Sequence, residues 1–138
     1  MFFIQLSVIL KKIIKINMKK PPFHKSVQFT IRGILWILRN ERNFQIHILG
    51  LIVNLFLIVY LGLSNFEAAL IILVSFFVLV TEALNTCVEK ICDYIQPEFD
   101  SRIGIIKDLA GGAVLLATIS AICVGVLVYW PYLKLYFY

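Results

Sequence analysis

The sequence predicts an all-α membrane protein with three transmembrane helices and an N-terminal amphipathic surface helix. Of its 138 residues, 61% are hydrophobic and only 15% are charged, whereas about 25% are charged in a typical soluble domain. The mean hydropathy of +0.92 agrees with this class. The length allows one domain of a few helices, so the composition and size exclude a water-soluble globule and a second catalytic module.

Three stretches are apolar and long enough to cross a bilayer, which takes about 20 helical residues. They run from about residue 47 to 63, from about 66 towards 93, and from about 109 to 130. Glycine, serine and asparagine at residues 62–65 predict a tight turn between the first two. Pro97 ends or follows the second helix, and we expect a loop from there to about Ile106.

A fourth helix is expected over residues 26–38, where apolar residues share the segment with Arg32. It is too short and too charged at its ends to span, so we expect it to lie on the membrane surface. Residues 1–25 form a basic extension before a single membrane-embedded domain over residues 26–138. Met18, followed by two lysines, resembles an ordinary start, so residues 1–17 are either native or an upstream extension.

Positive charge is concentrated in the N-terminal part. Nine of the 13 Lys and Arg residues lie at or before Arg42, whereas the turn at residues 62–66 carries none. Short segments rich in Lys and Arg favour the cytoplasmic side of a membrane. We therefore expect a cytoplasmic N-terminus, an external C-terminus and basic contacts with anionic lipid rather than with nucleic acid.

Polar residues interrupt the second apolar stretch at helical spacing. Glu82, Asn85, Glu89 and Asp93 are separated by three, four and four positions, which places them on one helix face. An ionisable group in a membrane helix is costly and is therefore a functional candidate. With the expected orientation, this polar stripe lies at the cytoplasmic end of the second helix.

Three further charged residues border the spans on the same side, and together with the stripe they suggest a chemistry. Glu41 precedes the first span, and Lys107 and Asp108 open the third. Glu41 and Glu89 could hold Mg²⁺, which proteins commonly bind through one or two carboxylates plus substrate phosphates. Lys107 could neutralise phosphate oxygens, and the deeply placed Glu82 could take a proton from a hydroxyl. Metal, phosphate binder and base are the recurring parts of phosphoryl transfer.

Four blocks of sequence resemble, in order, the signatures of the prokaryotic diacylglycerol kinase family, which includes the undecaprenol kinases. They are residues 40–47 (NERNFQIH), 82–89 (EALNTCVE), 93–98 (DYIQPE) and 107–115 (KDLAGGAVL). The resemblance covers about Ser26 to Trp130. It implies a homotrimeric lipid kinase of the bacterial cytoplasmic membrane, which uses ATP and Mg²⁺ to phosphorylate diacylglycerol or undecaprenol and builds its sites from neighbouring protomers.

The resemblance also implies a role for each matching residue. Glu82 is implied to be the general base, Asn85 and Gly111 to contact the lipid with it, and Asp93 to support Lys107. The implied Mg²⁺ ligands are Glu41 and Glu89. The residues implied to bind ATP are Phe29, Glu41, Glu89, Glu98, Phe99, Asp100, Lys107 and Asp108.

The sequence departs from the family pattern at three places. Gln45 stands where a basic residue is common, Asp100 where histidine is frequent, and Gly111 where alanine or serine lines the lipid site. The first two departures concern details of nucleotide and head-group contacts, and the third concerns which lipid is accepted. Diacylglycerol and undecaprenol both stay open as substrates.

Two other classes of function are compatible with part of the pattern. A proton-coupled transporter using Glu82 explains one membrane carboxylate, but not the polar residues that gather around it. In a non-enzymatic membrane adaptor, the cluster of charged and polar residues would be an energetic cost without a function. Of the remaining polar residues, Asn54 is expected to form a hydrogen bond between helices and Glu67 to begin a helix, whereas His24 and His47 are not expected to be ligands or switches.

Overall fold

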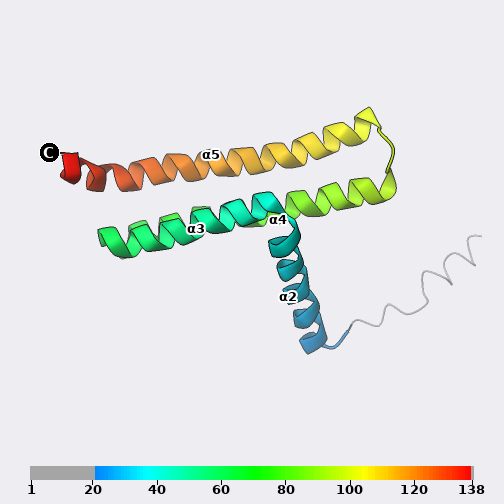
Figure 1. Cartoon of the computed structure of the whole chain (residues 1–138), viewed down its shortest axis with the longest axis horizontal. Helices are drawn as coiled ribbons and strands as arrows, with labels where there is room; N and C mark the ends of the chain where they lie inside the picture. Colours follow the sequence, from blue (N-terminus) through cyan, green and yellow to red (C-terminus); the bar gives the residue numbers. More distant parts are fainter. Residues whose placement is uncertain (1–20, 138) are drawn as a thin grey trace, which may run out of the picture. The chain divides into compact units, whose positions relative to one another are not determined.

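The computed structural model describes residues 21–137, with side chains as far as residue 134. Within that part the chain forms only helices (Figure 1): α2 (Phe23–Asn40), α3 (Arg42–Leu61), α4 (Asn65–Ile95) and α5 (Ser101–Phe137). Helices α3, α4 and α5 are long and apolar enough to cross a membrane. The predicted all-α class with three spans is therefore confirmed, whereas residues 1–17 and most of the basic extension lie outside the described residues.

The chain divides into two compact units between Ile34 and Leu35. The described part of the first unit is the start of α2, in which apolar and basic residues alternate at helical spacing and no side chain is buried. The Arg32 guanidinium lies over the ring of Phe29, 5.8 Å from its centre. This segment has the amphipathic character that the sequence predicts for a surface helix.

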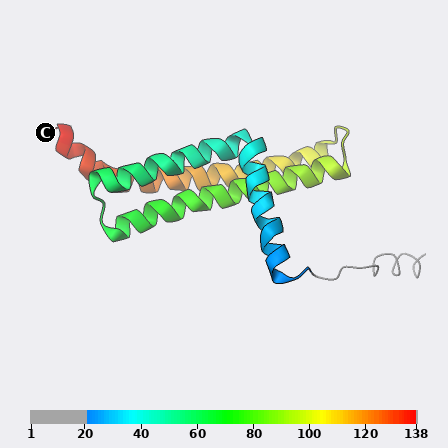
Figure 2. The same ribbon diagram turned by 60° about the horizontal axis from the view of Figure 1, so that its bottom comes forward.

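The second unit contains the three long helices, which run in alternating directions. Helix α4 packs against both α3 and α5, and Figures 1 and 2 show all three helices side by side. Their contacts bury Phe44, Ile71, Val78 and Ala117. Most other apolar side chains of these helices point outwards, which suits helices surrounded by lipid.

The turn between α3 and α4 follows from its sequence. Gly62 adopts a left-handed conformation with φ of 65°, and its N–H donates to the Val59 carbonyl while that of Leu63 donates to the Ile58 carbonyl. This pattern of two bonds around a left-handed glycine is the Schellman helix ending. The tight turn predicted at residues 62–65 is confirmed.

Helix α4 begins with a reciprocal cap. The Ser64 hydroxyl accepts from the Glu67 N–H, and the Glu67 carboxylate accepts from the Ser64 N–H at 2.9 Å. The Tyr132 hydroxyl of α5 donates to the same carboxylate at 2.7 Å. Glu67 therefore begins a helix, as predicted, and also ties the far end of α5 to this turn.

A polar chain joins the three spans. The Asn54 amide of α3 donates to the Ser75 hydroxyl of α4 at 3.1 Å, and it accepts from the Tyr129 hydroxyl of α5, also at 3.1 Å. Ser75 in turn donates to the Ile71 carbonyl. The expectation that Asn54 hydrogen-bonds between helices is confirmed, and it fixes the relative register of all three.

The loop after α4 is shorter than the sequence predicts. The expected loop to Ile106 is wrong, because α5 begins at Ser101 and only residues 96–100 connect the helices. The Asp100 carboxylate accepts from the Arg102 N–H at 2.8 Å, which satisfies a free donor of the first turn and starts the helix early. The six additional helical residues, 101–106, extend the polar start of α5 beside the end of α4.

Candidate functional site

The break between α2 and α3 places Glu41. The last carbonyls of α2 are satisfied by side chains: Asn40 donates to the Trp36 carbonyl at 2.7 Å, and Gln45 donates to the Leu38 carbonyl at 3.0 Å. The helix therefore ends without a costly unpaired group. Glu41 itself has an extended backbone and occupies the position just before α3. The end of α2 and the start of α3 therefore fix the position of the Glu41 backbone.

The predicted polar stripe starts on the face of α4 that packs within the bundle and ends at the exposed Asp93. Glu82 and Asn85 are buried, with 4% and 7% of their surface exposed. The Asn85 amide donates to Glu89 at 2.9 Å, while its buried carbonyl oxygen has no hydrogen-bond partner among the described residues. A buried amide oxygen without a donor is rare and costs about 1–3 kcal/mol. This oxygen is therefore available for a donor on a bound molecule.

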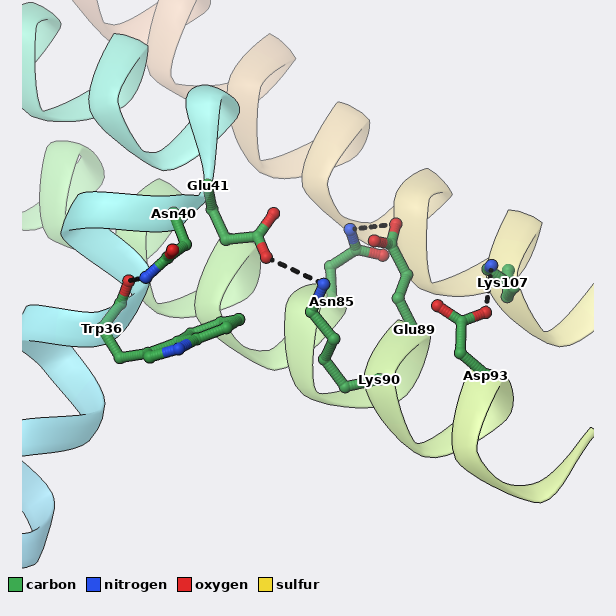
Figure 3. A network of polar contacts seen from close by, with 8 residues as sticks. All are labelled: Trp36, Asn40, Glu41, Asn85, Glu89, Lys90, Asp93 and Lys107. Carbon is green, nitrogen blue, oxygen red and sulfur yellow. Dashed lines mark hydrogen bonds and ion pairs between the residues drawn. The ribbon is translucent and has the colours of Figure 1, made fainter. Parts of the chain in front are cut away.

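Glu41 meets this stripe through a lysine that the sequence analysis does not single out. Lys90 Nζ lies 3.1 Å from Glu41 Oε1 and 5.5 Å from the centre of the Trp36 ring. Figure 3 shows the Glu41 carboxylate facing the segment of α4 that carries Asn85, Glu89 and Lys90. The ion pair of Lys90 and Glu41 thus links the start of α3 to the second half of α4.

The start of α5 adds a second cation. Lys107 Nζ lies 2.9 Å from Oδ1 of Asp93, which is one turn beyond Glu89 on α4 (Figure 3). Beside this pair is a cleft of about 420 Å³. The residues around it that were predicted to bind ATP or support its binding are Asp93, Glu98, Phe99, Asp100, Lys107 and Asp108.

Asp100 is held at the edge of this cleft by Arg102. Its carboxylate accepts two further bonds from the guanidinium, at 3.2 and 2.8 Å. These hydrogen bonds from a cation hold the pKa of Asp100 below its ordinary value. At neutral pH this position therefore carries a negative charge that is already paired.

His47 lies closer to the stripe than the sequence analysis anticipates. Its Nε2 is 4.0 Å from Oε2 of Glu82, and the two side chains are 23% and 5% exposed. His47 follows the buried Phe44 by three positions and therefore shares its face of α3. That face packs on α4.

Two predicted site residues remain, Phe29 and Gly111. Phe29 belongs to the first unit, where it contacts Arg32. Gly111 is in α5, and a Cβ at this position would meet no other atom within 4 Å. Among the described residues, no group of three or more His, Cys, Asp or Glu side chains could by itself hold a metal ion. A cation at Glu41 and Glu89 therefore needs oxygen ligands from a bound molecule.

The arrangement can support a specific kind of chemistry. It combines one buried carboxylate, two more carboxylates held by nitrogen donors, and a lysine beside an open cleft. Such a set can bind an anionic, phosphate-bearing molecule at one side and receive a polar group from the apolar interior at the other. The individual roles of these residues stay predictions.

Comparison with known proteins agrees with the sequence resemblance. Residues 28–129 match the family model described as prokaryotic diacylglycerol kinase. The chain is 33% identical over 101 residues to a diacylglycerol kinase of Synechocystis, covering 72% of this chain and 58% of that protein. It is 32% identical over 109 residues to an undecaprenol kinase of Bacillus subtilis, covering 79% and 89%, and 26% identical over 110 residues to a diacylglycerol kinase of Escherichia coli, covering 78% and 88%.

Proposed function

Because the chain belongs to the prokaryotic diacylglycerol kinase family, we propose that it transfers the γ-phosphoryl group of ATP to a membrane lipid alcohol. The product is phosphatidic acid from diacylglycerol, or undecaprenyl phosphate from undecaprenol. One observation carries the proposal: charged residues from the start of α3, the second half of α4 and the start of α5 converge at one end of the spans. A lipid enters such a site from the bilayer and a nucleotide enters from water.

Glu82 is assigned as the general base. It is the most buried carboxylate of the stripe, at 4% exposed, so a lipid alcohol reaching it is shielded from water. The carboxylate accepts the hydroxyl proton as the alcohol oxygen attacks the γ-phosphorus, and the bond to the β-phosphate oxygen breaks to release ADP. A base positioned in this way contributes about 10²–10⁴-fold to the rate.

Asn85 is assigned to the lipid head group. Its amide nitrogen is occupied by Glu89, whereas its buried oxygen lacks a donor. A hydroxyl of the substrate, or a water bound with it, can supply that donor and remove the cost of the unpaired oxygen. The same side chain thereby connects lipid binding to the carboxylate of Glu89.

Glu41 and Glu89 are assigned as Mg²⁺ ligands. Their oxygen donors fit a hard divalent cation, and two carboxylates together with phosphate oxygens and water are a usual Mg²⁺ environment. When bound, Mg²⁺ neutralises charge on the ATP phosphates. Lys90 pairs with the carboxylate of Glu41, and the Asn85 amide donates to that of Glu89.

The cleft beside α5 is assigned to ATP. Lys107 and its partner Asp93 lie at this cleft. Glu98, Phe99, Asp100 and Asp108 line the same space. A lysine neutralises phosphate oxygens where charge gathers in the transition state.

Assembly and orientation complete the proposal. We place the site at the cytoplasmic face of a bacterial membrane, with the N-terminus inside and the C-terminus outside, because Lys and Arg concentrate before α3. We further propose a homotrimer whose sites include residues of neighbouring copies, in which case an isolated protomer is inactive.

The direct test measures phosphate transfer by the purified full-length protein in mixed micelles. Diacylglycerol and undecaprenol are offered side by side with labelled ATP and Mg²⁺, and at least one must be phosphorylated. Glu82→Gln should lower the rate of transfer about 10²–10⁴-fold, whereas Glu67→Gln, in the first turn of the same helix, should not. Undiminished turnover in Glu82→Gln removes it as the base. Absence of transfer to either alcohol, with efflux driven by a pH gradient from proteoliposomes, favours the transporter instead.

A further inference from the structure

The contact between His47 and Glu82 joins α3 to the buried carboxylate of α4. The distance from Nε2 to Oε2 is 4.0 Å, within ion-pair range and beyond a direct hydrogen bond. Asn43, one turn earlier on α3, also approaches the Glu82 carboxyl. The first two turns of α3 therefore present two polar side chains to one acid.

His47 also lines a cleft between the three spans. This cleft measures about 460 Å³, and its lining combines small and apolar residues with three neutral polar ones: Asn54, Ser75 and Thr118. All of the lining belongs to described residues, and none of it except His47 is ionisable. The carboxylate of Glu82 is therefore the charged group that the structure places beside the imidazole within the described residues.

We propose that His47 is a positioning residue that fixes the Glu82 carboxylate for its reaction with the lipid hydroxyl. The proposal rests on the proposed kinase function. A carboxylate on a long side chain has several rotamers, and an imidazole N–H on one side limits which oxygen faces the incoming alcohol. A misplacement of about 1 Å at a reacting group can cost about 100-fold in rate. His47 acts through Glu82 and does not itself exchange a proton with substrate.

Three substitutions at His47 separate positioning from packing. His47→Leu removes the donor but keeps an apolar side chain, and it should lower kcat about 10-fold to 100-fold with KM for ATP unchanged. His47→Gln places an amide nitrogen near the former Nε2 and should recover part of this loss. His47→Asn is a matched control of the same chemistry, because its shorter amide reaches only the position of Nδ1, and it should recover none.

A double substitution tests whether His47 acts through Glu82. Added to Glu82→Gln, His47→Leu should cause no further loss of the residual rate, because the group that it positions is already gone. A further loss by the same factor as in the wild-type background overturns the proposal. A wild-type kcat in His47→Leu also overturns the proposal. The same holds if His47→Gln and His47→Asn lose equal amounts of kcat and both have lower thermal stability.

A spectroscopic measurement tests the contact independently of activity. With ¹⁵N-labelled histidine, only His24 and His47 give side-chain signals, and a His24→Gln variant assigns them. Glu82→Gln should shift the Nε2 signal of His47, and Glu67→Gln should not. If that shift is found in a protein that phosphorylates neither alcohol, the contact stands but the kinase function and the positioning role both fail. If transfer is active and the shift is absent, the His47 proposal alone fails.

Discussion

Lys90 holds Glu41 across the junction of α4 and α3, with 3.1 Å between Nζ and Oε1, while its ammonium lies over the ring of Trp36. The pair is partly open to solvent, since the side chains are 54% and 22% exposed. Pairs of this kind contribute about 0–1 kcal/mol to stability. The pair therefore matters because it places the positive charge of Lys90 beside Glu41, a proposed metal ligand.

Replacing Lys90 should make Mg²⁺ easier to bind. In Lys90→Gln no ammonium competes for Glu41, so the Mg²⁺ concentration giving half-maximal activity should fall, while the free energy of unfolding changes by less than about 1 kcal/mol. Titration of activity with Mg²⁺ at fixed ATP measures the first quantity. Lys134→Gln is the matched control, because Lys134 also lies over a tryptophan ring, that of Trp130 at 5.4 Å. A higher Mg²⁺ requirement in Lys90→Gln contradicts the prediction.

Loss of Lys107 should weaken the use of ATP more than loss of its partner. Lys107→Met removes a charge that faces the cleft, and we expect kcat/KM for ATP to fall about 100-fold or more. Asp93→Asn leaves the lysine charged but less well oriented, so the fall should be about tenfold or less. Initial rates at varied ATP and saturating lipid measure both. An equal loss in the two variants would show that the pair, rather than the cation, is what matters.

Breaking the polar chain between the spans should cost stability without stopping catalysis. Tyr129→Phe removes the bond to Asn54, and hydrogen bonds between membrane helices average about 0.6 kcal/mol. Asn54→Leu removes two bonds and should cost more. A double-mutant cycle on the free energy of unfolding in micelles checks the coupling. Tyr60→Phe, which removes an exposed hydroxyl from α3, serves as the control, and additive effects in the cycle argue against the bond.

Asp100 should make the start of α5 sensitive to acid. Because its pKa is lowered in the folded protein, its stabilising effect is complete above the ordinary carboxylate range and is lost as the pH falls through the folded pKa. Asp100→Asn should therefore lower the thermal stability at pH 6 and make no difference once the pH is well below that pKa. Thermal unfolding of wild type and Asp100→Asn across this pH range measures the effect. Arg102→Gln should also lower the thermal stability at pH 6. A difference between wild type and Asp100→Asn that persists at the acidic limit contradicts the assignment.

The sequence by itself determined the architecture of this protein and most of its candidate site. Long apolar runs define membrane spans because each span must satisfy its own backbone in lipid, and the residues of the turn at Gly62 and Ser64 form the local bonds that their types favour. The spacing of Glu82, Asn85, Glu89 and Asp93 also defines a helix face without reference to any other part of the chain. The family could be inferred because four short blocks carry it in order.

Only the tertiary structure decided which residues meet across helices. The ion pair of Glu41 with Lys90 and the approach of His47 to Glu82 depend on how α3 is rotated against α4, and no local pattern encodes that rotation. The early start of α5 was also hidden, because Asp100 acts as a cap only when its side chain turns back onto the Arg102 N–H. Local chemistry sets the helices and their polar faces, whereas packing between distant segments decides which of those polar groups become partners.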